Sequence, residues 1–254
     1  IEGVAMAGHS HWAGIKHKKA ANDAKRGRIW SKIARMIIVA AKAGGGDPGQ
    51  NLTLRYAIDK GKAANMPKDT IEKAIKKGTG DLEGVRYENH TYEGYGQNGI
   101  AIIVETLTDN KQRTVAEVRH IFSKYGGNLA ENGAVAWMFD QKGLVEIPKN
   151  NLDEDEMMMI ALDAGADDFV AEDDVYQIFT PYAELHNVHQ KLETDGYQIE
   201  KVELTRLPKN TINADDFALS LLKLIDALED CDDVQKVYAN CEISDEILER
   251  LSNE

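Results

Sequence analysis

The sequence contains little cysteine, proline or aromatic residue, and it lacks long apolar runs. Of its 254 residues, 2 are cysteines, 5 are prolines and 7% are aromatic. The two cysteines, Cys231 and Cys241, are too few for a disulfide framework and would supply only half of a four-ligand zinc site, so we expect reduced thiols in the cytoplasm. No apolar stretch approaches the roughly 18 residues of a membrane-spanning helix, and no apolar signal-type segment opens the chain. We therefore expect a soluble cytoplasmic protein without a membrane partner.

Basic residues are fewer than acidic residues over the whole chain, but they are concentrated in one part of it. The formal net charge is −13, from 30 Lys and Arg against 43 Asp and Glu. We take Met6 as the native start, because residues 1–5 (IEGVA) read as an added extension. From Met6 to Gly80 there are 16 basic and 5 acidic residues, a net charge of +11, whereas residues 81–254 carry 14 and 37, a net charge of −23. Such an asymmetry indicates that one part meets nucleic acid or another anionic surface.

The basic part reads as helices throughout, which predicts an all-α domain. One helix ends at Gly27 and the next ends in the glycine-rich turn GGGDPG; a third starts at an Asn51 cap, and a fourth has Pro67 in its first turn and Gly78 just past its end. In the second helix, cations at helical spacing share a stripe that we expect to face solvent: Arg28, Lys32, Arg35 and Lys42. Apolar residues form the stripe that we expect to pack inward: Ile29, Ile33, Ile37 and Ala40.

The rest of the chain changes to β-branched runs and short helices. Strand, helix and strand patterns occupy residues 99–140 and again 202–243, and a complete β-α-β-β-α-β unit, the ferredoxin-like order, lies between them. We predict an α+β protein of three domains, an N-terminal all-α helical domain and two ferredoxin-like α+β domains, one inserted in the other. The predicted limits are 6–80 for the basic helical domain, 81–141 plus 205–254 for the discontinuous domain, and 142–204 for the insert, with the strand near 203–207 shared ambiguously between the last two.

Several motifs resemble a known family. They include MAGHSHWAGIKHKKAANDAKRGRIWSKI, AGGGDP, NMPKDTIEKAIKKGTG and LIDALEDCDDVQKVYAN, and the resemblance runs from Met6 to Asn240. These motifs resemble the bacterial YebC/PmpR family, related to the mitochondrial translational activator of cytochrome c oxidase; His11 replaces the more usual Lys. The resemblance implies a cytoplasmic, non-enzymatic, three-domain protein acting in gene expression. Members are described either as probable DNA-binding transcriptional regulators or as ribosome-associated translation factors.

The concentration of cations, interleaved with His and Trp, predicts contacts to nucleic-acid phosphates and bases. The predicted contact residues are His9, His11, Trp12, Lys16, His17, Lys18, Lys19, Lys25, Arg26, Arg28, Lys32, Arg35, Lys68, Lys73, Lys76 and Lys77. Two alternatives are a capping loop in which Trp12 fills the helical core, and lysine-rich faces that are merely solvated. A metal site on the three histidines lacks a carboxylate or thiol partner and is surrounded by repelling lysines, so we expect no metal.

Other motifs have structural interpretations. GYGQNG at residues 94–99 precedes an apolar strand rather than a helix, which favours a turn over a dinucleotide site. The acidic runs at 152–156 and 167–174 lack the ligand spacing of a calcium loop. No serine or cysteine stands in a recognisable nucleophile arrangement with a base. We therefore expect neither a cofactor nor an enzymatic activity.

These observations lead to one function hypothesis with two alternatives. The first is a non-enzymatic nucleic-acid-binding regulator of gene expression, resembling probable DNA-binding transcriptional regulators. The first alternative is a ribosome-associated translation factor that binds ribosomal or messenger RNA through the basic domain; the second is a protein-interaction scaffold without nucleic acid. The expected partners are thus DNA or RNA, with the ribosome as a candidate, and the expected oligomeric state is a monomer.

Overall fold

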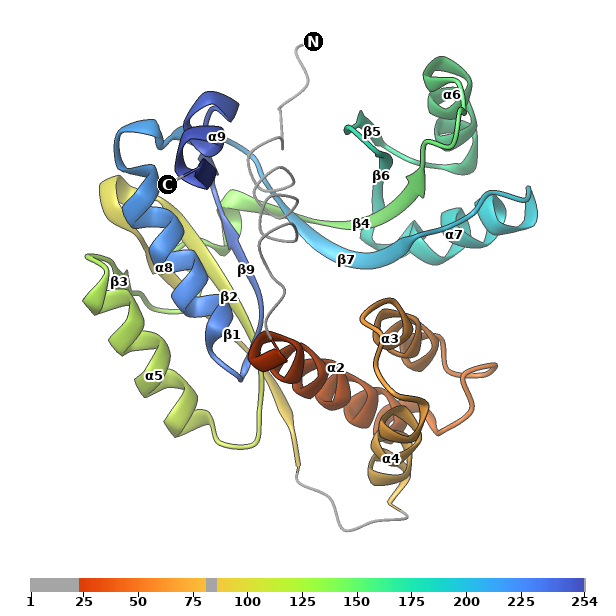
Figure 1. The fold of residues 1–254 in the computed structure, drawn as a ribbon, viewed down its shortest axis with the longest axis horizontal. Coiled ribbons are helices and arrows are strands. Elements are labelled where there is room, and N and C mark those ends of the chain that lie inside the picture. Colours follow the sequence, from red (N-terminus) through yellow and green to blue (C-terminus); the bar gives the residue numbers. More distant parts are fainter. Residues whose placement is uncertain (1–22, 81–85, 254) are drawn as a thin grey trace. The chain divides into compact units, whose positions relative to one another are not determined.

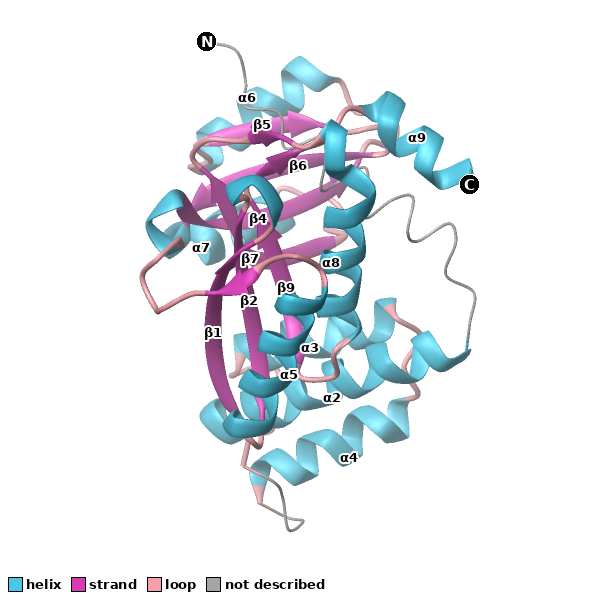
Figure 2. Ribbon diagram, turned by 90° about the vertical axis from the view of Figure 1, so that its left-hand side faces the viewer, coloured by secondary structure: helices cyan, strands magenta, loops and turns pink. Residues whose placement is uncertain are grey.

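The computed structural model describes residues 23–80 and 86–253 (Figures 1 and 2). A helical region comes first and is followed by antiparallel four-stranded sheets with helices, which confirms the predicted mixed class. The chain forms two compact units, one of residues 1–138 with 209–254 and the other of residues 139–208. Among the described helices, none is both long and apolar enough to cross a membrane.

The first unit begins with a bundle of three helices: α2 (Asp23–Gly44), α3 (Leu52–Ala63) and α4 (Lys68–Thr79). Its core is made of apolar side chains from all three helices, among them Ile33, Ile37, Leu54 and Ile71. Asn51 caps α3 as predicted, because its side-chain oxygen accepts a hydrogen bond from the Leu54 amide at 3.1 Å. The same side chain donates to the carbonyls of residues 40 and 45, both at 2.8 Å, and so fixes the turn between α2 and α3.

Two glycines of this bundle and one isoleucine do not behave as predicted. Gly27 does not end a helix, since α2 runs through it from Asp23 to Gly44. Gly78 lies inside the last turn of α4, and an ideal Cβ there would stand 2.5 Å from the Ile38 carbonyl oxygen and 2.6 Å from the Ala41 Cβ. The helix ends instead at Gly80, whose φ of 88° is the left-handed conformation of a C-cap. Ile29 does not pack inward and is 45% exposed.

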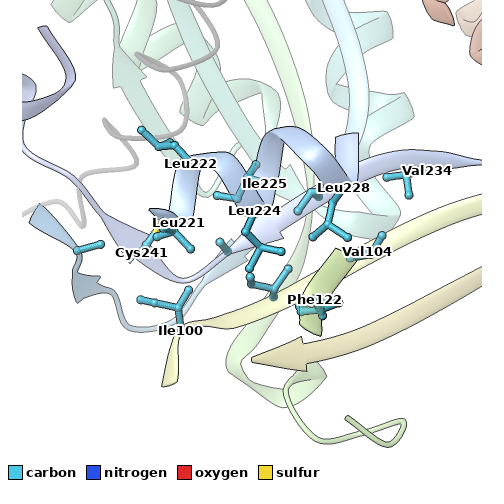
Figure 3. Packing of buried hydrophobic residues seen from close by; sticks show 14 of the residues in the cluster. Ile100, Val104, Phe122, Leu221, Leu222, Leu224, Ile225, Leu228, Val234 and Cys241 are labelled. Atoms are coloured by element: carbon cyan, nitrogen blue, oxygen red, sulfur yellow. The ribbon is translucent and has the colours of Figure 1, made fainter. Parts of the chain in front are cut away.

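The second part of this unit is a sheet in the order β3-β1-β2-β9. Its strands are β1 (Glu88–Tyr95), β2 (Ala101–Thr108), β3 (Asn128–Leu129) and β9 (Val234–Ala239). Helices α5 (Lys111–Lys124) and α8 (Ala218–Asp230) pack on it, and Figure 3 shows Leu224 and Leu228 of α8 near Val104 and Phe122. The GYGQNG motif covers the end of β1 and the turn into β2, and the turn was predicted. A short parallel pair, β8 (Ile212–Asn213) with β10 (Cys241–Glu242), and α9 (Asp245–Asn253) complete the unit.

The second strand of the pattern at residues 99–140 was predicted at residues 133–140, but only residues 139–140 belong to a strand, and β1 was not predicted. The buried carboxylate of Glu93 on β1 accepts hydrogen bonds from the amides of Gly133, Val135 and Ala136 at 2.7, 2.7 and 2.8 Å. These are backbone donors that a strand would use for its ladder, so the segment forms a turn and a 3-10 helix (Ala136–Met138) instead. The first four-stranded sheet therefore has the chain order ββαβ followed, after the insert, by αβ.

The second unit has the predicted β-α-β-β-α-β order. Its elements are β4 (Phe139–Pro148), α6 (Glu154–Ala164), β5 (Asp168–Ala171), β6 (Val175–Pro181), α7 (Leu185–Thr194) and β7 (Lys201–Pro208). The strands pair antiparallel in the order β5-β6-β4-β7, and side chains of α6 and α7 close one core with β4 and β6. β7 pairs with β4 from Phe139↔Pro208 to Glu146↔Lys201, so it belongs to this sheet alone. The unit therefore extends to residues 139–208, beyond the predicted 142–204 at both ends.

Candidate nucleic-acid interface

The predicted contact residues fall into three groups. Those before residue 23 lie outside the described residues, as does the side chain of Lys25: His9, His11, Trp12, Lys16, His17, Lys18 and Lys19. The described ones occupy two helices of the bundle, Arg26, Arg28, Lys32 and Arg35 on α2 and Lys68, Lys73, Lys76 and Lys77 on α4. The structure gives these two helices different surroundings.

The α4 lysine face consists of Lys73, Lys76 and Lys77, all of which are exposed. It lies opposite the side of the helix that packs into the bundle, where Ile71 and Ala74 are 7% and 4% exposed. Lys68, one turn earlier, lies 3.7 Å from the Glu72 carboxylate at i,i+4 spacing. The lysines point outward because their helix must bury its apolar stripe against α2, which leaves the basic positions in water.

Of the four α2 cations predicted to face solvent, Lys42 is exposed, whereas Arg28, Lys32 and Arg35 are only partly exposed. The Arg35 guanidinium lies 2.9 Å from the Asp233 carboxylate, and its side chain is only 17% exposed. It also donates to the Asp232 carbonyl, and Lys32 donates to the Glu229 carbonyl. Three cations therefore meet one acidic segment, Glu229–Asp233, which joins α8 to β9; the third, Arg28, lies 3.6 Å from the Asp230 carboxylate. Burial lowers the pKa of Lys32, against the opposing influence of the acidic groups around it.

Asp233 is the centre of this contact. Its side chain is 3% exposed, and its Oδ2 atom accepts hydrogen bonds from Arg113 and Thr114, both at 2.7 Å, and from Thr108 at 3.1 Å. Burial acts to raise the pKa of Asp233, but the hydrogen bonds from Arg113 and Thr114 and the charges of Arg113 and Arg35 hold it below its usual value. Asp233 is therefore a buried anion with a complete set of donors.

An open pocket of about 520 Å³ lies at this contact. It is lined by Arg28, Arg35, Tyr87, Asp109, Arg113, Glu117, Asp230, Asp232 and Asp233. The Arg35 guanidinium carbon is 5.7 Å from the centre of the Tyr87 ring. Five carboxylates outnumber three guanidinium groups here, so the lining does not favour an added anion in the state that the structure describes. Arg113 and Asp233 were absent from the predicted set of contact residues. The acidic sequence EDCDD at residues 229–233 was the signal that could have indicated a partner for the α2 cations.

Comparison with known proteins identifies the family. The model described as the TACO1/YebC protein N-terminal domain matches residues 10–81, and the model of the TACO1/YebC second and third domain matches residues 87–241. The chain belongs to the TACO1/YebC family. The TACO1/YebC N-terminal match contains α2 to α4 and every predicted contact residue except His9.

Full-length relatives share about half of their residues with this TACO1/YebC chain. A protein of Persephonella marina is 55% identical over 250 residues, covering 97% of this chain and 100% of its own length, and one of Acidithiobacillus ferrooxidans is 56% identical over 247 residues, with coverages of 97% and 98%. Both are named "Probable transcriptional regulatory protein". The crystal structure of a conserved hypothetical protein from Aquifex aeolicus matches with a TM-score of 0.84 at 48% identity, covering 94% of this chain and 99% of that one.

Proposed function

We propose that this TACO1/YebC protein is a non-enzymatic regulator of gene expression whose helical bundle contacts the phosphates of a nucleic acid. The observation that carries the proposal is the exposed α4 lysine face, Lys73, Lys76 and Lys77, in a bundle that is strongly basic within an otherwise acidic chain. Lysine ammonium groups neutralise backbone phosphates as point charges and release counterions from the nucleic acid. The names of the relatives support a regulatory role.

The α4 surface favours backbone contacts over base reading. Direct reading of bases in the major groove uses Arg or Lys on guanine and Asn or Gln on adenine. Of these residue types the exposed positions of α4 hold lysine alone, whose ammonium group acts on phosphates as a point charge without the planar fork of arginine. We therefore propose binding with weak sequence selectivity, which suits duplex DNA bound by shape and equally suits RNA in a ribosome-associated role.

The experiment is a salt titration of binding to a 20-bp DNA duplex and to a 20-nucleotide RNA. We expect the logarithm of the affinity to fall linearly with the logarithm of the salt concentration. Lys73→Gln/Lys76→Gln/Lys77→Gln should reduce the slope by about 2.7 on duplex DNA, because each phosphate that is no longer neutralised removes about 0.9 from it. The matched control is Lys111→Gln/Lys124→Gln/Lys223→Gln, which removes the same charge from exposed positions of α5 and α8. Equal losses in both variants, or no salt dependence at all, would contradict the proposal.

A protein-interaction role is a second candidate, and the inserted unit favours it. Residues 139–208 hold 5 basic and 17 acidic residues, a net charge of −12, which repels phosphates. On α6, Met159 is 63% exposed and Leu162 is 50% exposed, beside the acidic first turn of the helix. If the lysine variants bind nucleic acid like the unchanged chain, this surface becomes the first place to seek a basic protein partner.

A further inference from the structure

The cationic side of α2 and the acidic segment Glu229–Asp233 form a contact made almost entirely of charged and polar groups. Its two carboxylate contacts are Arg35 with Asp233 and Arg28 with Asp230, and its carbonyl contacts come from Lys32 and Arg35. The apolar core of the bundle and the apolar core of the sheet with α5 and α8 share no residue. Tyr87, which precedes β1, packs against the bundle core beside this contact. The contacts between α2 and the acidic segment are themselves electrostatic, so another polyanion can replace them.

The acidic segment offers α2 the same kind of ligand that a nucleic-acid backbone would offer. Carboxylate and carbonyl oxygens follow one another along the segment and accept from guanidinium and ammonium groups, as successive phosphate oxygens do. Because the three α2 cations lie on one stripe of the helix, a single backbone of phosphates could engage them together once the segment is displaced. The segment thus covers residues whose charge and spacing suit a polyanion.

Displacement would leave the buried charge of Asp233 paired with Arg113, although its Oδ1 atom would lose the hydrogen bond from Arg35. Asp233 Oδ2 keeps its donors Arg113, Thr108 and Thr114, all of which belong to the sheet and α5 rather than to the bundle. Asp230 and Asp232 are exposed already, so water can take the place of their α2 partners. The acidic side of the contact is therefore stable without α2, which is what a reversible contact requires.

We propose that Glu229–Asp233 is an intramolecular competitor that masks the Arg28, Lys32 and Arg35 surface until a nucleic acid displaces it. This inference rests on the proposed function, since it concerns the regulation of the same interface. Nucleic acid would first meet the exposed α4 lysine face and then exchange its phosphates for the acidic segment on α2. Neutralising the segment should therefore strengthen binding although no cation is changed.

The test is the double variant Asp230→Asn/Asp232→Asn in the full chain. Neither side chain is buried, and the network around Asp233 is untouched. We expect binding to the 20-nucleotide RNA and the 20-bp duplex to tighten by about two- to fivefold, as estimated from the strength of the exposed Arg28–Asp230 ion pair. The matched control is Asp173→Asn/Asp174→Asn, which makes the same change in charge at exposed positions of the inserted unit and should change affinity less than twofold.

A second measurement uses the unchanged chain, so it does not depend on whether a variant folds. Hydrogen exchange of the amides in residues 229–234 should become faster when the nucleic acid is saturating, because the segment loses the carbonyl and carboxylate contacts that hold it against α2 and opens more often. If the chain binds nucleic acid through the α4 lysines but the double variant matches its control and this exchange stays constant, the masking proposal is wrong and the proposed function survives. If neither the unchanged chain nor the double variant binds, both proposals are wrong. Binding that appears only in the double variant supports masking.

Discussion

The sharpest prediction concerns two helical glycines that the structure places in opposite surroundings. A Cβ at Gly27 would have no atom within 4 Å, whereas a Cβ at Gly78 would stand 2.5 Å from the Ile38 carbonyl oxygen and 2.6 Å from the Ala41 Cβ. By helix propensity alone, alanine at either position stabilises the helix by about 1 kcal/mol. At Gly78, however, α4 must move away from the backbone of α2, and such overpacking costs about 1–3 kcal/mol or more.

We therefore expect opposite signs from the two substitutions. Gly27→Ala should raise the free energy of unfolding by about 0.5–1 kcal/mol. Gly78→Ala should lower it by about 1–2 kcal/mol, because a backbone oxygen 2.5 Å away puts the steric cost at about 2–3 kcal/mol, above the gain in propensity. The measurement is urea unfolding followed by the fluorescence of Trp30, whose Nε1 donates to the Ala64 carbonyl within the bundle at 2.9 Å, in a Trp12→Phe/Trp137→Phe background. The midpoints are compared at an unchanged m value.

A Gly78→Ala variant as stable as the unchanged chain would contradict this expectation. That outcome would mean that α2 and α4 are not in contact at Gly78, or that they separate at no cost. A destabilised Gly27→Ala variant would contradict the continuity of α2 through residue 27.

Three further predictions follow from buried polar groups. Asn51→Ala should lower the free energy of unfolding by about 1–2 kcal/mol in the same urea assay, because the cap of α3 and two bonds that fix the preceding turn are removed together; Thr53→Ala, at an exposed position of the same helix, is the control. Burial raises the pKa of Cys231 to about 11 and that of Cys241 to about 12, so both thiols should resist Ellman's reagent at pH 8 until urea unfolds the chain, and fast labelling of either in the folded protein would contradict its burial. Because the pKa of Asp233 is lower in the folded than in the unfolded chain, its stabilising contribution is present above about pH 4 and lost as the pH falls through the folded value. Unfolding midpoints measured from pH 6 down to pH 2 should therefore decline less steeply in Asp233→Asn, and parallel curves would oppose this assignment.

The periodic parts of the fold could be predicted from the sequence, because they depend on neighbouring residues. The cap at Asn51, the β-α-β-β-α-β order of the insert and the burial of Ile33 and Ile37 follow from local chemistry and hydrophobic spacing. The predictions are wrong where a residue distant in the sequence determines the local backbone structure. Glu93 accepts from the backbone amides of residues 133, 135 and 136 and so prevents a strand there. The close approach of Ile38 requires a glycine at position 78, and that glycine was interpreted as a helix end.

The candidate interface likewise has one part that could be predicted from the sequence and one part that could not. Composition and helical spacing alone indicated a basic helical region, and for α4 the exposure of its lysines follows from its own amphipathic pattern. The fate of the α2 cations could not be predicted, because their partners lie nearly 200 residues away in Glu229–Asp233. A sequence determines which charges share a helix face, since that depends on a repeat of 3.6 residues. Only the tertiary structure decides whether such a face meets water or a segment of opposite charge, since that depends on how separate elements pack.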